Sequence, residues 1–195
     1  MLHSEAMEKP LASAPLHEFF LSTTQRSFDE LGVGDEAVVG YVAVVLTEFA
    51  RCDRLYALRT RRGLAIDGVG DIRRATDRIA ADRSNVLRTR AGQKYVGDYA
   101  LFMTGLFRTH VESRGALGYY FEEGQRSYRA VSELDLTLFR TGFLLFEQLA
   151  KNFEDYSGAL DYMRKAYFAP QPGHSPFAEF LRHVEGWITS GLSDN

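Results

Sequence analysis

The sequence has little cysteine and lacks several signals that mark common protein classes. One cysteine, Cys52, occurs in 195 residues, which excludes an intramolecular disulfide and a zinc site built on several thiolates. No apolar run reaches the ~18 residues of a membrane-spanning helix. The first residues also lack the basic start and apolar run of a secretory signal peptide. We therefore expect a cytoplasmic protein that does not span a membrane.

Strand signals are equally scarce along the chain. Alternation with a period of two residues is rare, and the single Asp-Gly pair, Asp67-Gly68, lacks the β-branched flanks of a hairpin. Apolar residues instead recur with the spacing of an α-helix. The sequence predicts an all-α fold, a bundle of about six to seven helices with a C-terminal amphipathic helix after a Pro/Gly linker.

Proline and glycine divide the chain into four parts. We expect a flexible N-terminal lead-in over residues 1–15, a helical bundle over 16–168, a linker over 169–176 and a docking helix over 177–190. The docking helix is predicted to bury one face against this subunit's core or against another subunit. That face consists of Phe177, Phe180, Leu181, Val184, Trp187 and Ile188.

Several helix ends can be predicted within the bundle. Gly32 ends the first helix, and Asp35 is placed to cap the second. A long helix is predicted from Ser84 through His110. Two further helices are predicted, one over residues 119–134 and one over residues 136–167, the second with a break near residues 156–158.

Charge is unevenly distributed, although the net charge is only -3. Arg59 to Lys94 contains ten basic and four acidic residues, a local charge of +6. A basic segment is typical of proteins that bind nucleic acid. This segment, however, has no aromatic residue for base stacking, and its acidic residues are interspersed among its arginines. We interpret it as a solvated face or as a contact to the acidic remainder of a partner subunit, and we do not expect nucleic acid as a partner.

The usual catalytic and cofactor motifs are missing. There is no nucleophile elbow, no Glu-x-x-His or His-Glu-x-x-His pair, and no nucleotide-binding glycine motif. Cys52 has arginines beside it in sequence, but successive helical residues do not face each other. We predict no cofactor, no metal and no catalytic residue, which favours a protein that is not an enzyme.

Two polar residues fall on apolar helix faces, and three interpretations remain open. Asp53 and His110 both lie at the ends of predicted helices. The favoured interpretation is that both helices end a turn early and leave these residues exposed. A buried structural pair is the second interpretation, because a buried charge needs a partner. A ligand-binding or catalytic role is the third.

Aromatic residues line the same helices and give a candidate ligand site. A pocket between helices for a small apolar or aromatic ligand would use these side chains, although a plain aromatic core explains them as well. Asp98, by contrast, is interpreted as the polar edge beside Lys94, and Gly105 as a place where another helix approaches closely. The candidate ligand-binding residues are Asp53, Tyr99, Phe102, His110, Tyr120, Phe121 and Tyr128.

The central part of the chain resembles uncharacterised bacterial all-helical proteins. In these a "GD-aromatic-x-LF-x-x-GLF" helix precedes a "YY-x-x-x-G-x-x-x-Y" helix, and the resemblance covers about residues 37–134. It implies a bacterial source and an all-helical fold, and carries no known activity. This chain departs from the pattern after "GLF", where Arg108-Thr109 replaces Pro-Glu. The matching residues are Gly97, Asp98, Tyr99, Leu101, Phe102, Gly105, Leu106, Phe107, Tyr119, Tyr120, Gly124 and Tyr128.

Three functions follow from these observations. The leading hypothesis is a non-enzymatic, homo-oligomeric regulatory or interaction module, most simply a homodimer. The alternative is a helical protein that binds a small molecule in an aromatic-lined pocket. A helical DNA-binding regulator is the least favoured, since residues 114–131 faintly resemble a tetracycline-repressor recognition helix but lie beyond the middle of the chain.

Overall fold

The computed structural model describes residues 13–50, 74 and 86–168. These residues form seven helices and no strand, which confirms the all-α class. Among them, no helix has both the length and the apolar character required to cross a bilayer. Asp53, the linker and the predicted C-terminal helix lie outside the described residues. The helices are α1 (Ser13–Leu31), α2 (Glu36–Ala50), α5 (Val86–Leu106), α6 (Arg108–Ser113), α7 (Leu117–Thr137), α8 (Phe143–Lys151) and α9 (Phe153–Tyr167).

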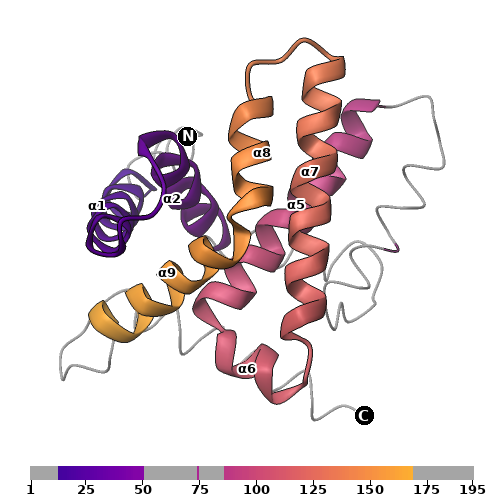
Figure 1. Ribbon diagram of the computed structural model, residues 1–195. Coiled ribbons are helices and arrows are strands. Elements are labelled where there is room, and N and C mark those ends of the chain that lie inside the picture. The colour runs from indigo at the N-terminus through magenta and orange to yellow at the C-terminus, as the bar shows by residue number, and fades with distance from the viewer. Residues whose placement is uncertain (1–12, 51–73, 75–85, 169–195) are drawn as a thin grey trace, which may run out of the picture.

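The helices form two groups that meet along α5 and α9 (Figure 1). Helices α1 and α2 make an antiparallel pair, while α5 and α7 lie side by side with α8 packed along the second half of α7. Helix α9 continues from α8 and packs against both α1 and α5. Phe28 of α1 stacks on Tyr156 of α9 with ring centroids 5.8 Å apart. The two groups therefore share one apolar core.

The turn between α1 and α2 follows the sequence prediction. Helix α1 ends at Leu31, and Gly32 then adopts the left-handed conformation with φ 64°. The backbone N–H of Val38 donates to Asp35 Oδ1 at 3.0 Å, so Asp35 caps α2 as predicted. The hydrogen bond to Val38 lowers the pKa of Asp35, which therefore keeps its charge at the positive end of the helix dipole.

Two predicted helix boundaries are wrong. The helix expected from Ser84 through His110 is interrupted at Phe107, which separates α5 from α6 with a non-helical φ of -119° and ψ of 32°. Phe107 is buried and packs against Phe102, so tertiary packing overrides the local helical preference. The break expected near residues 156–158 is absent, because α9 runs continuously through them. The interruptions lie instead at residues 138–142 and at Asn152.

Glycines let the central helices approach closely. A Cβ on Gly105 would lie 2.6 Å from Leu160 of α9, which confirms the close approach predicted at Gly105. A Cβ on Gly124 of α7 would lie 2.2 Å from the Phe153 ring. Both distances are far shorter than atomic contact allows, so these two positions set how near α5 and α7 come to α9.

Candidate functional site

Helix α5 presents a stripe of charged residues toward the inside of the bundle. Arg90, Lys94 and Asp98 are spaced four residues apart and therefore lie on one helix face. The prediction that Asp98 lies beside Lys94 is confirmed by an ion pair of 2.6 Å between Lys94 Nζ and Asp98 Oδ2. The sequence did not indicate how deeply this edge lies, and Asp98 is buried, with only 1% of its surface exposed. Helices α2 and α7 cover it.

Asp98 joins three helices through its two carboxylate oxygens. The hydroxyl of Tyr41 on α2 donates to Asp98 Oδ1 at 2.5 Å, and that of Tyr128 on α7 donates to the same oxygen at 3.0 Å. Lys94 supplies the third donor and the compensating charge, and its ammonium lies 5.0 Å from the centre of the Tyr41 ring. Three donors, one of them a cation, meet the requirement that a buried carboxylate be paired and hydrogen-bonded.

Gly97 explains how the Tyr128 hydroxyl reaches this carboxylate. A Cβ at position 97 would lie 2.7 Å from the Tyr128 ring, so the ring rests directly against the α5 backbone. The next residue along α5 is Asp98, which accepts the Tyr128 hydroxyl. The Gly-Asp pair of the sequence thus has a physical basis here: glycine admits the ring and aspartate holds its hydroxyl.

A second ion pair lies one to two turns earlier on the same stripe. Arg90 makes a bidentate ion pair with Asp135 of α7. Two guanidinium nitrogens donate, Nε to Oδ1 and Nη2 to Oδ2, the latter at 2.7 Å. Asp135 is fully buried, while Arg140 stands 3.8 Å away as a weaker partner. The hydrogen bond to Asp135 raises the pKa of Arg90, which also lies over the Phe146 ring. We call Tyr41, Arg90, Lys94, Asp98, Tyr128 and Asp135 the polar network.

Burial keeps the two tyrosines of the network protonated. It raises the pKa of both Tyr41 and Tyr128 well above the ordinary tyrosine value, and the nearby negative charge of Asp98 adds to the effect. Both hydroxyls therefore remain donors throughout the physiological pH range. This arrangement suits a fixed support for the fold, because neither tyrosine is poised to give up its proton near neutral pH.

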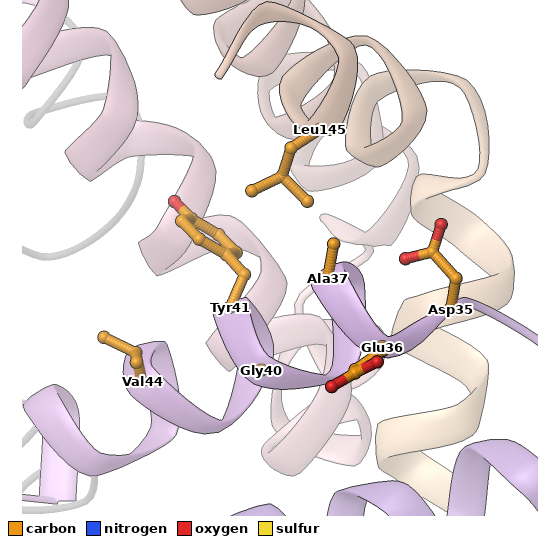
Figure 2. Close-up of a pocket in the computed structure, with 7 residues that line it drawn as sticks. All are labelled: Asp35, Glu36, Ala37, Gly40, Tyr41, Val44 and Leu145. Atoms are coloured by element: carbon orange, nitrogen blue, oxygen red, sulfur yellow. The ribbon is translucent and has the colours of Figure 1, made fainter. Parts of the chain in front are cut away.

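An open groove lies on the other side of Tyr41 (Figure 2). It has a volume of about 650 Å³, and its floor is largely apolar, with Leu145 of α8 extending toward α2. Two acidic residues stand at one end, at the start of α2. We call this the α2–α8 groove. Its lining residues are Asp35, Glu36, Ala37, Gly40, Tyr41, Val44 and Leu145.

Most polar groups at the groove are already held by other parts of the fold. Asp35 accepts from the Val38 backbone through Oδ1 and from Gln148 Nε2 through Oδ2, the latter at 3.3 Å. The Tyr41 hydroxyl is directed away from the groove toward Asp98. The groove therefore offers apolar surface and negative charge more than free hydrogen-bonding groups.

The aromatic residues predicted to bind a ligand lie in or against the core. Phe102 and Tyr128 are fully buried, Tyr120 is nearly so, and Tyr99 and Phe121 are partly buried. None of the five lines the α2–α8 groove. Their role in ligand binding stays a prediction, and Tyr128 has a contact that the sequence did not indicate, its bond to Asp98.

His110 lies on the short helix α6 and is partly buried. Burial, with a further contribution from the positive charge of Arg114, lowers its pKa below the ordinary value of 6.5. Its proposed partner Asp53 lies outside the described residues, so their pairing stays a prediction. Helix α6 does reach His110, although as a separate helix after the break at Phe107.

Asp135, Arg90 and Tyr41 were missed as site residues by sequence reasoning. Asp135 follows Tyr128 and Val131 at i+7 and i+4, which places it on the buried face of α7. The sequence therefore contained a signal for Asp135, an acidic residue on an apolar helix face, but none for its partner Arg90. Among the described residues, no group of three or more histidine, cysteine or acidic side chains is arranged to hold a metal ion.

Comparison with known proteins gives no assignment. No protein-family model, curated protein or solved structure matches this chain. The resemblance of its central helices to uncharacterised bacterial proteins stays a prediction. The function proposed below rests on the polar network and the groove.

Proposed function

We propose that the chain is a non-enzymatic helical interaction module that acts as a homo-oligomer, most simply a homodimer, in the bacterial cytoplasm. The observation that carries this proposal is the α2–α8 groove, which is open, largely apolar and built from two helices. The centre of a protein interface is typically apolar, with charges kept at its rim. The groove has this arrangement, since its two acids lie at one end.

The polar network gives the groove a fixed floor. Tyr41 lines the groove and is also tied to Asp98, which is bound in turn by Lys94 and Tyr128. A side chain held in one position loses little conformational freedom when a partner binds. The network therefore supports a role in presenting the groove, and its charges are compensated within the fold.

The predicted C-terminal helix is a second reason to favour association between chains. Its apolar residues recur with helical spacing over Phe177–Ile188, and such a face must be buried somewhere. Burial against another subunit would add it to the oligomer interface, whereas burial against its own subunit would leave the groove as the main surface. Both cases fit an interaction module, and removal of the segment distinguishes them.

The small-molecule alternative is favoured by the size of the groove. Its volume of about 650 Å³ lies within the ~300–1,000 Å³ typical of ligand pockets. Ligand pockets also enclose most of the ligand, whereas this groove is broadly open, so it ranks second. A native mass spectrum of the purified protein tests it, because a retained small molecule would appear as a reproducible mass above that of the chain.

Sedimentation equilibrium tests the leading proposal. The chain has a mass of 22.0 kDa, and we expect a species of twice that mass, or a higher multiple, at micromolar concentration. A constant monomer mass up to several hundred micromolar would overturn the proposal. A reproducible mass increment from a bound small molecule in a monomer would favour the alternative.

A further inference from the structure

Phe139 occupies an unusual position between α7 and α8. Its side chain is 97% exposed, and its backbone has a φ of 54°, in the left-handed region that side chains other than glycine and asparagine rarely adopt. Two backbone hydrogen bonds enforce this conformation, from the Arg140 N–H to the Asp135 carbonyl and from the Phe139 N–H to the Leu136 carbonyl. They form the glycine-favouring motif that ends many helices.

The phenylalanine is therefore unfavourable twice within its own subunit. Its backbone is strained where glycine would be relaxed, and its ring is left in water. Strain retained at an exposed site is a reason to look for a binding role there. Leu136 and Leu144 beside it are also well exposed, and Arg140 is the one charged residue from 136 to 146. We call Phe139 and Arg140 the hairpin tip.

The α2–α8 groove complements this tip in shape and charge. Its floor is apolar around Gly40, where an added Cβ would meet no atom within 4 Å, so the groove has free space at that point. Asp35 and Glu36 supply negative charge at its end, opposite in sign to Arg140. An aromatic ring followed by a guanidinium matches an apolar floor followed by two carboxylates.

We propose that the hairpin tip of one copy of this chain inserts into the α2–α8 groove of a second copy. Phe139 then lies over Gly40, and Arg140 lies toward Asp35 and Glu36. Phe139 is 97% exposed and so does not fill the groove of its own subunit, and the ring that occupies the groove therefore comes from another molecule. Reciprocal insertion gives a closed twofold dimer. This inference rests on the proposed homo-oligomeric function and names its contact.

The predicted C-terminal helix is the competing occupant. Its polar residues include Glu179, Arg182 and Glu185, so it has no excess of positive charge to match the acidic end of the groove. The hairpin tip does have that match through Arg140, whose side chain is 50% exposed and only a weak partner of Asp135 in its own subunit, 3.8 Å away. We therefore assign the groove to the tip and not to the C-terminal helix.

Two substitutions test the contact from its two sides, by sedimentation equilibrium of the full-length chain. Phe139→Ser removes the ring, and Gly40→Phe fills the groove from within. Each is expected to raise the dimer Kd at least tenfold. Gly118→Phe is the matched control, because a Cβ there also meets no atom within 4 Å but the position does not line the groove. It should leave the Kd unchanged.

A charge exchange tests the orientation of the tip. Arg140→Glu and Glu36→Arg each place like charges together and should weaken the dimer several-fold, whereas the double variant restores the opposite-charge pair and should recover most of the affinity. Because Arg140 also stands 3.8 Å from Asp135 of its own subunit, Arg140→Gln separates the loss of that contact from the effect of the reversed charge. Circular dichroism and the Tm confirm that each variant is folded. If positions 140 and 36 lie far apart in the dimer, the double variant will not recover the affinity, which would contradict this orientation of the tip.

The outcomes separate this inference from the function it rests on. A wild-type chain that stays monomeric would overturn both. A dimer whose Kd is unchanged by both Phe139→Ser and Gly40→Phe would overturn the tip contact and leave the homo-oligomeric function standing. A dimer lost on removal of residues 170–195 but unaffected by these substitutions would assign the interface to the C-terminal helix instead.

Discussion

Among single residues, Asp98 is the one whose removal should most disturb the fold. Replacing it with alanine leaves the partly buried Lys94 ammonium without its carboxylate and two tyrosine hydroxyls without their acceptor. Removing one member of a buried ion pair typically costs about 3–5 kcal/mol. We expect Asp98→Ala to lower the free energy of unfolding by about 3 kcal/mol, measured by urea denaturation followed by circular dichroism.

The control for this prediction replaces both charges at once. Lys94→Met with Asp98→Leu removes the pair without leaving an uncompensated charge, and should destabilise less than Asp98→Ala alone. Tyr128→Phe removes a single hydrogen bond and should cost about 1 kcal/mol. An Asp98→Ala variant as stable as a typical surface variant would contradict the buried network.

His110 gives a prediction about pH at the residue scale. Burial and Arg114 lower its pKa, whereas a salt bridge to Asp53 would raise it. We expect its imidazole to titrate below 6.5 in a two-dimensional NMR pH series, and to move upward in Arg114→Ala. A titration midpoint above 6.5 that falls in Asp53→Asn would instead support the pairing with Asp53.

The same shift has a defined effect on stability. Because the folded pKa is lower than the unfolded value, the unfolded chain takes up a proton more readily as the pH falls. The contribution of His110 is therefore fully present above about pH 6.5 and is lost as the pH falls toward the folded pKa. In His110→Gln this part of the pH dependence should be absent from unfolding curves.

For the helices, the closest crossings depend on glycine. At Gly124 an added methyl group would overlap the fully buried Phe153 ring, from which it would lie only 2.2 Å away. Overpacking of this kind usually costs about 1–3 kcal/mol. We expect Gly124→Ala to lower the free energy of unfolding by that amount in urea denaturation, although alanine is the better helix former.

Gly158 is the matched control for this prediction. It lies within α9, and an added Cβ there would meet no atom within 4 Å. Gly158→Ala should therefore stabilise the chain by roughly 0.5–1 kcal/mol through helix propensity alone. If both alanine variants were stabilised equally, α7 and α9 would not cross as closely as described.

The accuracy of sequence reasoning differed between helices and contacts. Helical periodicity and the Asp35 cap predicted most of the helices, because both signals are local. The break predicted between the helices 119–134 and 136–167 lies a few residues later, at 138–142, because the turn there uses a left-handed phenylalanine where glycine is expected. Local sequence signals do not indicate a residue whose backbone is strained in the folded chain.

The candidate site was less predictable because its contacts are distant in sequence. A helical wheel correctly placed Asp98 beside Lys94, but it describes only the helix that carries them. The burial of Asp98 depends on Tyr41 and Tyr128, which are 57 and 30 residues away. No pattern within one helix indicates which other helices cover it.

At the scale of the whole molecule, the C-terminal segment is expected to contribute to stability or to assembly. Removal of residues 170–195 deletes the predicted apolar face of 177–188. If that face docks on its own subunit, the Tm should fall while the number of chains in the oligomer stays the same. If it docks on another subunit, sedimentation should show a smaller oligomer. Unchanged mass and Tm together would contradict docking in either form.

The polar network also constrains how this protein can change over evolutionary time. Arg90 with Asp135, and Lys94 with Asp98, are charges whose loss one at a time leaves an uncompensated partner in the core. We therefore expect both residues of an ion pair to be replaced together, or neither of them. In a family of relatives, positions 90 and 135 should therefore covary as a pair, and so should positions 94 and 98, leaving a coevolutionary signature of the helix packing.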